Sequence, residues 1–334
     1  MSAVATSSVA GKFASFLDRA RAGFLRKSLH FKFAQNIYKQ RAERTILLFA
    51  LSVAVNLGLV LLYPSIPFYL APLILGVPHL YSSLRYGNRG MHFSSYYWIW
   101  FLMFGFQLLR QHGLVSDQYS IFNSAAIVAS LLLSGVEFRQ KKNVFVLLVP
   151  LSISLLYAYD SFTGVMFLAI AHNFIAFIFW YRECKNKKDQ RVMVSALALT
   201  VATSIALYFL PFADPMITLT ENLTARSATP VMIWFTSVFI FSQSIHYFIW
   251  LKAIPDHAIA TQAPQSFRGS IRQITEIFGA RVYWIAIALI LMSLVWVYFY
   301  GWEEGRKLYV QLSSYHGFAE IAFLLTSQKK VARV

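Results

Sequence analysis

Cysteine is almost absent from this chain of 334 residues, in which Cys184 is the single example. One thiol cannot form a disulfide within the chain, and a metal cluster held by several thiolates needs more than one cysteine. Both kinds of site are therefore excluded. Any metal site must be built from histidine, carboxylate or other oxygen ligands.

Acidic residues are also scarce: 14 Asp and Glu stand against 30 Lys and Arg, which gives a net charge of +16. In a soluble protein such an excess would favour nucleic acid as a partner. Here 57% of the residues are hydrophobic and only 13% are charged, which is typical of a polytopic membrane protein. We therefore expect membrane lipids as partners and no nucleic acid. The sequence identifies no protein partner.

Long apolar runs define the fold class. About 20 apolar residues suffice for one helical crossing of a bilayer, and ten segments fit that length: 45–62, 67–86, 93–110, 119–136, 143–159, 162–181, 192–211, 229–251, 281–300 and 308–327. The sequence predicts an all-α, polytopic integral membrane bundle of about ten helices over residues 45–327. A basic amphipathic segment at 1–44 is expected to lie on the cytoplasmic face, and a short basic tail follows at 328–334.

The basic residues also predict the orientation of the chain. With the N-terminus in the cytoplasm, the inside segments hold 26 Lys and Arg and the outside segments hold four. This asymmetry is what the positive-inside rule requires. It places both termini in the cytoplasm and favours the bacterial inner membrane. We expect the segment at 211–228 to be an outer loop.

Four histidines interrupt apolar runs that all cross the membrane in the same direction. An ionisable side chain in hydrocarbon is costly, so it normally faces the interior of the bundle and marks a functional path. We expect the four imidazoles to converge on one site and to serve as metal ligands: His79, His172, His246 and His316. The other histidines fall in tails or loops, where solvated positions are expected: His30, His92, His112 and His257.

Further polar residues accompany these histidines. Glu320 lies four residues after His316 and therefore on the same helix face, where it is the candidate catalytic group, fifth ligand or hydrogen-bond acceptor. Ligating imidazoles need an acceptor for their second ring nitrogen, and the nearby candidates are Asn173, Gln243, Ser83 and Tyr315. Pro78 precedes His79, so the carbonyl of Ile74 lacks its helical hydrogen bond. A donor set of imidazole and carboxylate suits iron (Fe2+) or another first-row metal.

Three other interpretations fit the same residues. Isolated membrane histidines often serve only as hydrogen-bonding residues between helices. Two of them could instead be the axial ligands of a haem in an electron carrier. A proton-coupled transporter could use the histidines and Glu320 as a relay.

A family resemblance favours the metal site. Gly76-Val77-Pro78-His79 resembles the Gly-aliphatic-Pro-His motif of the Brp/Blh family of bacterial carotene-cleaving membrane oxygenases. His246-Tyr247-Phe248 is similar to that family's His-aromatic pairs, and His316 is similar in position to its last histidine. The resemblance implies iron held by histidines on several helices, and cleavage of an apolar polyene with dioxygen.

This chain departs from the family pattern at three positions near these motifs. It has Leu80 where the family has glycine, Ser83 where the family has an acidic residue, and Trp250 where the family has a second histidine. The expected function is therefore a membrane-embedded oxygenase that acts on a hydrophobic, lipid-like or carotenoid-like small molecule.

Overall fold

A computed structural model gives the arrangement of the chain. It describes residues 9–28, 30–32, 35, 39–87, 161–224, 226–258, 266, 268–269, 288, 291–292, 294–302, 316–317 and 320. The predicted spans 93–110, 119–136 and 143–159 lie outside the described residues, as do half of 281–300, most of 308–327 and the tail 328–334.

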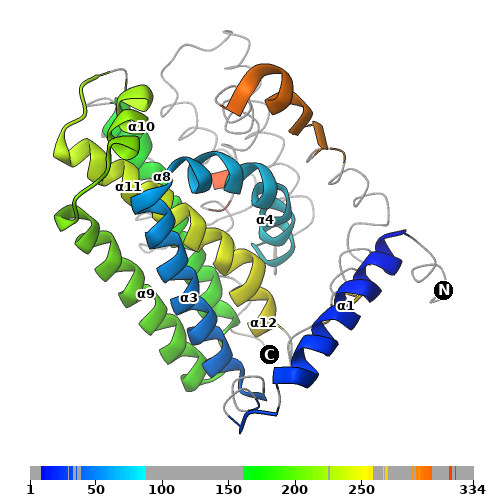
Figure 1. Cartoon of the computed structure of the whole chain (residues 1–334). Helices are drawn as coiled ribbons and strands as arrows, with labels where there is room; N and C mark the ends of the chain where they lie inside the picture. Colours follow the sequence, from blue (N-terminus) through cyan, green and yellow to red (C-terminus); the bar gives the residue numbers. More distant parts are fainter. Residues whose placement is uncertain are drawn as a thin grey trace, which may run out of the picture.

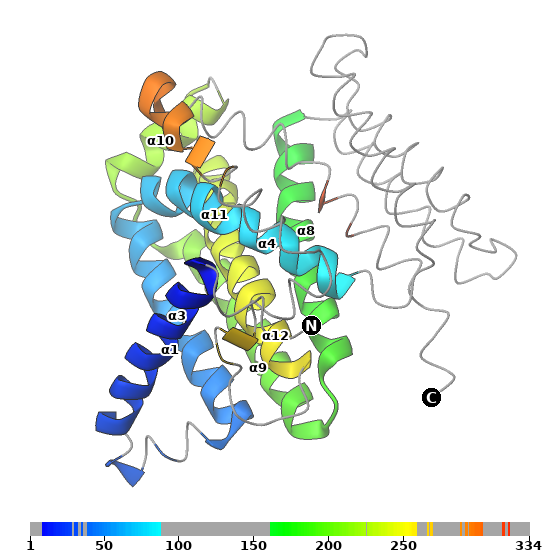
Figure 2. The same cartoon turned by 90° about the vertical axis from the view of Figure 1, so that its right-hand side faces the viewer.

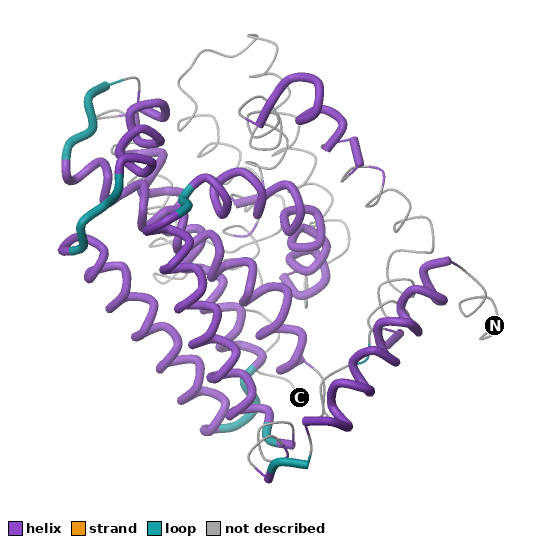
Figure 3. Tube along the Cα trace, viewed as in Figure 1, coloured by secondary structure: helices purple, strands orange, loops and turns teal. Residues whose placement is uncertain are grey.

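Every regular element in the described part of the chain is helical (Figures 1 and 3). The elements are α1 (Val9–Ser28), α3 (Arg41–Leu62), the π-helical η1 (Ile66–Leu70), α4 (Ala71–Gly87), α8 (Ser161–Glu183), α9 (Lys187–Ala206), the 3-10 helix η2 (Leu207–Phe209), α10 (Asp214–Thr224), α11 (Pro230–Phe248), the π-helical η3 (Ile249–Ala253) and α12 (Ile254–Ala258).

Within the described residues, three helices are long and apolar enough to cross a membrane. They are Arg41–Leu62 with 22 residues, Lys187–Phe209 with 23 and Pro230–Ala258 with 29. At a rise of about 1.5 Å per residue, each exceeds the roughly 30 Å of a hydrocarbon core. They coincide with three of the predicted spans. The total of about ten crossings stays a prediction.

Helix α11 forms the centre of the described bundle and contacts α3, α8 and α9. Its start has a clear local cause. The Thr229 side chain accepts a hydrogen bond from the Met232 N–H at 3.3 Å, and Pro230 occupies the first turn, where its missing N–H costs nothing. Most residues from Thr236 to Tyr247 are buried, as expected for a helix that is apolar on all sides.

Helix α4 departs from the common direction of the other helices. Figure 2 shows α4 running obliquely across α11, whereas α3, α8 and α9 lie roughly along it. The π-helical turn η1 leads directly into α4, and α4 contacts both α11 and η3. The predicted span 67–86 is therefore two elements, and its oblique course brings Pro78 and His79 against α11.

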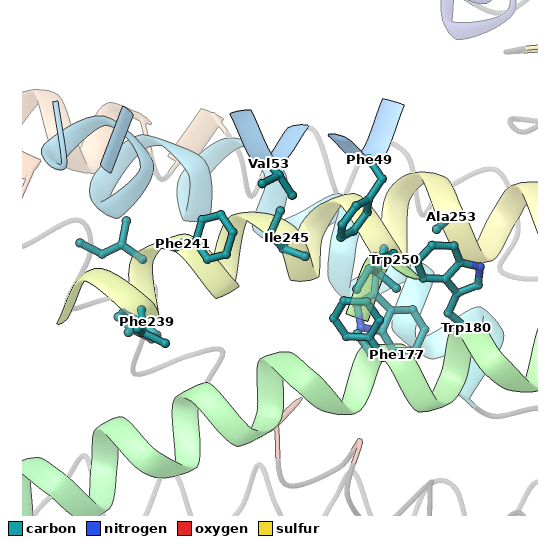
Figure 4. Close-up of a cluster of buried hydrophobic side chains, with 14 of the residues drawn as sticks. Phe49, Val53, Phe177, Trp180, Phe239, Phe241, Ile245, Trp250 and Ala253 are labelled. Carbon is teal, nitrogen blue, oxygen red and sulfur yellow. The ribbon is translucent and has the colours of Figure 1, made fainter. Parts of the chain in front are cut away.

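Aromatic rings fill the space between α3, α8 and α11 (Figure 4). The ring centroid of Phe49 lies 6.3 Å from that of Phe177, 6.1 Å from that of Trp180 and 5.5 Å from that of Phe248. Phe49 and Trp180 are completely buried. Because lipid is as apolar as these side chains, such close contacts, rather than the exclusion of water, hold membrane helices together.

Charged side chains are buried where α3, α9 and α12 meet. Arg41 and Asp189 approach to 3.6 Å, and Arg44 and Asp256 to 3.5 Å. All four residues are at most 6% exposed. Arg41 also donates to the backbone carbonyl of Asp256 at 2.9 Å. The basic N-terminal segment predicted to end at residue 44 thus contributes two arginines to the bundle.

One local expectation was wrong. His257, expected in a solvated loop, is 1% exposed on α12 because the helix of Pro230 continues past residue 251 through η3. Its Nδ1–H donates to the Ala253 carbonyl at 2.8 Å, and its Nε2 lies 3.7 Å from Asp189. The segment 211–228 contains helix α10, which packs on α11 and α3; that this segment lies outside the membrane stays a prediction.

Cys184 gives a simple test of the packing between α8 and α9. It is 7% exposed, and burial raises the pKa of its thiol to about 12. Because the thiolate is the reactive form, we expect native Cys184 to react slowly with a maleimide at pH 7–8. Its rate should keep rising with pH to about pH 12, where the thiol becomes mostly ionised.

The matched control for this experiment carries Cys184→Ser and Lys185→Cys, which moves the thiol to an exposed neighbour. We expect the native form of this variant to be labelled as fast as wild-type protein that has been unfolded in detergent. Equal labelling rates of the two native proteins, followed by mass spectrometry, would show that Cys184 is open to solvent.

Candidate metal centre

The four membrane histidines converge, as the sequence predicts. His79 comes from α4, His172 from α8 and His246 from α11, while His316 comes from the C-terminal part of the chain. One ring nitrogen of each lies within 4.8 Å of the corresponding nitrogen of every other. A single ion at the middle of such a group could be reached by all four imidazoles.

His79 lies between two of its neighbours. Its Nε2 is 3.1 Å from Nε2 of His246 and 3.1 Å from Nε2 of His316. Centroids of neighbouring rings are 4.5–5.0 Å apart around the group. A neutral imidazole has one N–H, so His79 can donate from Nε2 to at most one of these two nitrogens. Three Nε2 atoms that face one another are better satisfied by a shared cation.

The protonation of His246 is determined by its surroundings. Its Nδ1 lies 3.2 Å from the backbone carbonyl oxygen of Asn173, and a carbonyl can only accept. Nδ1 therefore carries the proton, and Nε2 of the neutral ring presents a lone pair to His79 and the rest of the group. This is the usual arrangement of a ligating histidine whose outer nitrogen is held by a hydrogen bond.

The residues predicted to accept hydrogen bonds from the ligating imidazoles differ in the partners that the structure gives them. Asn173 does provide the acceptor for His246, but through its backbone; its side-chain amide donates to the Ser242 hydroxyl at 2.9 Å. Gln243 donates to the Tyr247 hydroxyl at 3.2 Å. Ser83 is buried and lies beside Glu320. Tyr315 lies outside the described residues.

Glu320 is the acidic residue of the group. It is completely buried, with one carboxylate oxygen 3.4 Å from Nδ1 of His172 and the other 3.8 Å from Nε2 of His79. Neither oxygen has a hydrogen bond of regular geometry. Glu320 lies beside His79 and His172 in the structure, as the sequence predicts. Whether it acts as ligand or as catalytic group stays a prediction.

The unpaired polar atoms of the site fit a bound cation. Among the described residues, Nδ1 of His172 and both oxygens of Glu320 are buried and form no hydrogen bond of regular geometry. Leaving one buried polar group unpaired costs about 1–3 kcal/mol, and more for a charged group. A divalent cation would offset the carboxylate charge and occupy the lone pairs that face the centre.

Backbone irregularities place the histidines. Pro78 lies inside α4, and η3 follows directly after His246 on α11. A π-helical turn shifts backbone carbonyls out of the regular pattern and is frequent at functional sites. The Ser82 hydroxyl donates to the Trp250 carbonyl within η3. This bond ties α4 to the end of α11, so that His79 and His246 are held against each other.

Gly317 allows the C-terminal part of the chain to approach His172. A Cβ added at Gly317 would lie 3.3 Å from Cγ and 3.3 Å from Nδ1 of His172. We expect Gly317→Ala to displace this imidazole by a few tenths of an ångström and to weaken metal binding about tenfold, the scale of a disturbed ligand environment. The readout is metal content after dialysis against a graded chelator.

Gly58→Ala on α3 is the matched control, since no atom lies within 4 Å of its added Cβ. Both substitutions favour helix formation by up to about 1 kcal/mol. The control should therefore keep its metal and its thermal stability. Unchanged metal affinity in Gly317→Ala would contradict the close contact.

Sequence reasoning missed two further neighbours of the centre. The rings of Tyr247 and Trp250 lie 5.5 Å and 5.9 Å from that of His79, measured between centroids. Trp250 is completely buried, and Tyr247 is 2% exposed. Spacing alone could have found Trp250, because it lies four residues after His246 along the same continuous helix, in η3.

Comparison with known proteins adds nothing to this geometry. No family model, no curated protein and no solved structure matches the chain.

Proposed function

We propose that His79, His172, His246 and His316 hold an iron ion together with Glu320, and that the protein is a membrane-embedded oxygenase of an apolar substrate. The observation that carries this proposal is the set of four imidazole nitrogens within 4.8 Å of one another. Interhelical hydrogen bonding alone would need each ring to find its own partner. Here the nitrogens face a common centre.

The donor set supports the choice of metal. Imidazoles with one carboxylate, and no thiolate, suit iron and other first-row metals, and histidine–carboxylate sets with open positions are typical of non-haem Fe(II) oxygenases. Bound iron would supply the activation of dioxygen. Lys252 and the arginines near the inner end of the bundle are not among the proposed ligands.

The protein residues have definite tasks in this proposal. His79, His246 and Glu320 are at most 1% exposed, so the site excludes water and protects reactive species from it. The Asn173 carbonyl keeps the His246 ring in the orientation that directs Nε2 inward. Glu320 balances the charge of the cation, and it can accept or return a proton at a carboxylate oxygen.

The membrane setting supports the substrate class. Three described helices can cross a bilayer, and the histidines lie on or against them. A buried site inside such a bundle is reached most directly from the lipid. We propose the bacterial inner membrane with both termini in the cytoplasm, as the distribution of Lys and Arg indicates. The resemblance of Gly76-Val77-Pro78-His79 to the Brp/Blh motif agrees with this substrate class.

The haem alternative is less well supported by the geometry. Axial histidines of a haem face each other across a broad macrocycle. The four imidazole rings stand only 4.5–5.0 Å apart around the group, and this leaves no space for a porphyrin among them.

Elemental analysis of detergent-purified protein tests the proposal. We expect about one iron atom per chain, no haem absorption band, and oxygen consumption when an apolar polyene or lipid is supplied in micelles. Protein that folds normally but carries no metal after growth with iron would contradict the proposal. A Soret band would select the haem-binding carrier instead.

A further inference from the structure

An apolar groove opens beside the histidine group. It lies between α3, the η1–α4 segment and the α11–η3 segment, and its volume is about 460 Å³. Typical small-molecule sites measure about 300–1,000 Å³, so the groove has room for one chain-like molecule. Its walls are mainly aliphatic, with Leu59, Leu70, Ile74, Leu75 and Leu251 among the lining residues.

Tyr247 separates this groove from the metal centre. Its side chain lines the groove, and its ring also lies 5.5 Å from that of His79 and 6.1 Å from that of His246. Gln243 fixes the hydroxyl with a hydrogen bond of 3.2 Å. A chain lying in the groove therefore runs past a side chain that contacts both the groove and two of the histidines.

The two π-helical turns form part of the walls. Ile66 and Leu70 come from η1, and Leu251 and Lys252 come from η3. Each turn adjoins an element that carries a histidine, α4 for His79 and α11 for His246. The same irregularities that place the imidazoles thus shape the groove, which links the two features in one structure.

One end of the groove carries positive charge. Lys252 lines it, and its side chain stays 33% exposed. Its Nζ lies 3.0 Å from Asp256, but that carboxylate also pairs with Arg44 at 3.5 Å. Lys252 therefore shares this carboxylate with a second cation, and its partly exposed ammonium group favours an anionic group beside it in the groove.

We propose that the groove binds a single-chain anionic amphiphile of the fatty-acid type, with its hydrocarbon chain along the aliphatic walls and its carboxylate at Lys252. This inference names the substrate class of the proposed oxygenase and so rests on the proposed function. It identifies Tyr247 as a positioning residue that holds part of the chain near the centre.

Photo-crosslinking of the full chain in nanodiscs tests the inference. The probe is a sixteen-carbon fatty acid with a diazirine in its chain, and labelled peptides are identified by mass spectrometry. We expect labelling of residues on α3, α4 and α11 that line the groove, competition by palmitate, and about tenfold weaker competition by the neutral hexadecanol, as loss of a partly buried charge contact implies.

Two variants and a matched control make the test specific. Ala71→Phe fills the groove and should reduce labelling about tenfold or more, because a blocked site loses its chain contacts. Lys252→Gln should weaken palmitate about fivefold and leave hexadecanol unchanged. Ala54→Phe, at an exposed position on α3 outside the lining of the groove, should label like wild type.

Metal content measured on the same samples separates this inference from the function on which it rests. Normal iron with labelling unaffected by Ala71→Phe, or with hexadecanol competing as well as palmitate, would overturn the fatty-acid groove and leave the metal centre intact. Groove labelling as expected in a protein without metal would support the groove and contradict the oxygenase.

Discussion

Replacing His246 with alanine is expected to remove most of the bound metal, lowering affinity by at least about tenfold. His246 is the histidine whose ring is fixed most completely, since Nδ1 donates to the Asn173 carbonyl at 3.2 Å and Nε2 lies 3.1 Å from Nε2 of His79. Its loss takes away an inward-facing nitrogen that no nearby side chain can replace. Metal content per chain is the measurement.

His30→Ala is the control, because His30 is exposed and lies far from the group in sequence. Its metal content should equal that of wild type. A second readout removes ambiguity about folding: the His246 variant should elute as a monodisperse species with an unchanged helical circular dichroism spectrum. A folded His246→Ala protein that keeps its metal would show that the histidine is not a ligand.

Replacing Glu320 with glutamine should have opposite effects with and without metal. The change preserves volume but removes a charge from a completely buried position. With metal bound, the carboxylate offsets the charge of the cation, so the variant should bind metal about tenfold or more weakly and lose activity. After chelation, a carboxylate among imidazoles has no cation to pair with, and the variant should be at least as stable as wild type.

Thermal unfolding in the presence and absence of metal measures both effects. We expect metal to raise the melting temperature of wild type by at least about 2 °C more than it raises that of the variant. This difference corresponds to roughly 1 kcal/mol in the free energy of unfolding. Glu43→Gln is the control, since Glu43 is 44% exposed and pairs with Lys188 at the surface. If Glu320→Gln is as well tolerated as Glu43→Gln in metal affinity and activity, Glu320 has no role at the centre.

The sequence predicted the convergence of the histidines because the physical argument was strong. An ionisable group inside an apolar run has few tolerable places, and four such groups on crossings of one direction have fewer still. The same argument placed Glu320, since a spacing of four from His316 defines a helix face. The helical class followed from composition in the same way, as only helices and closed barrels satisfy backbone groups in lipid.

Details that depend on backbone geometry could not be predicted. The oblique course of α4 and the π-helical turns η1 and η3 leave no periodicity in the sequence. For this reason His257 was placed in a loop, although it is buried. The acceptor for His246 is the backbone carbonyl of Asn173. Every residue has such a carbonyl, so the sequence argument named the right residue but the wrong group, its side chain.

The central claim is that the four imidazoles bind one metal ion, and X-ray absorption at the metal edge tests it most directly. The account predicts about four to five nitrogen or oxygen neighbours at roughly 2.0–2.2 Å, with the multiple scattering of several imidazole rings and no sulfur neighbour. His79→Ala and His246→Ala should each reduce the imidazole scattering or abolish binding. A protein without bound metal, or a metal whose spectrum shows no imidazole, would contradict it.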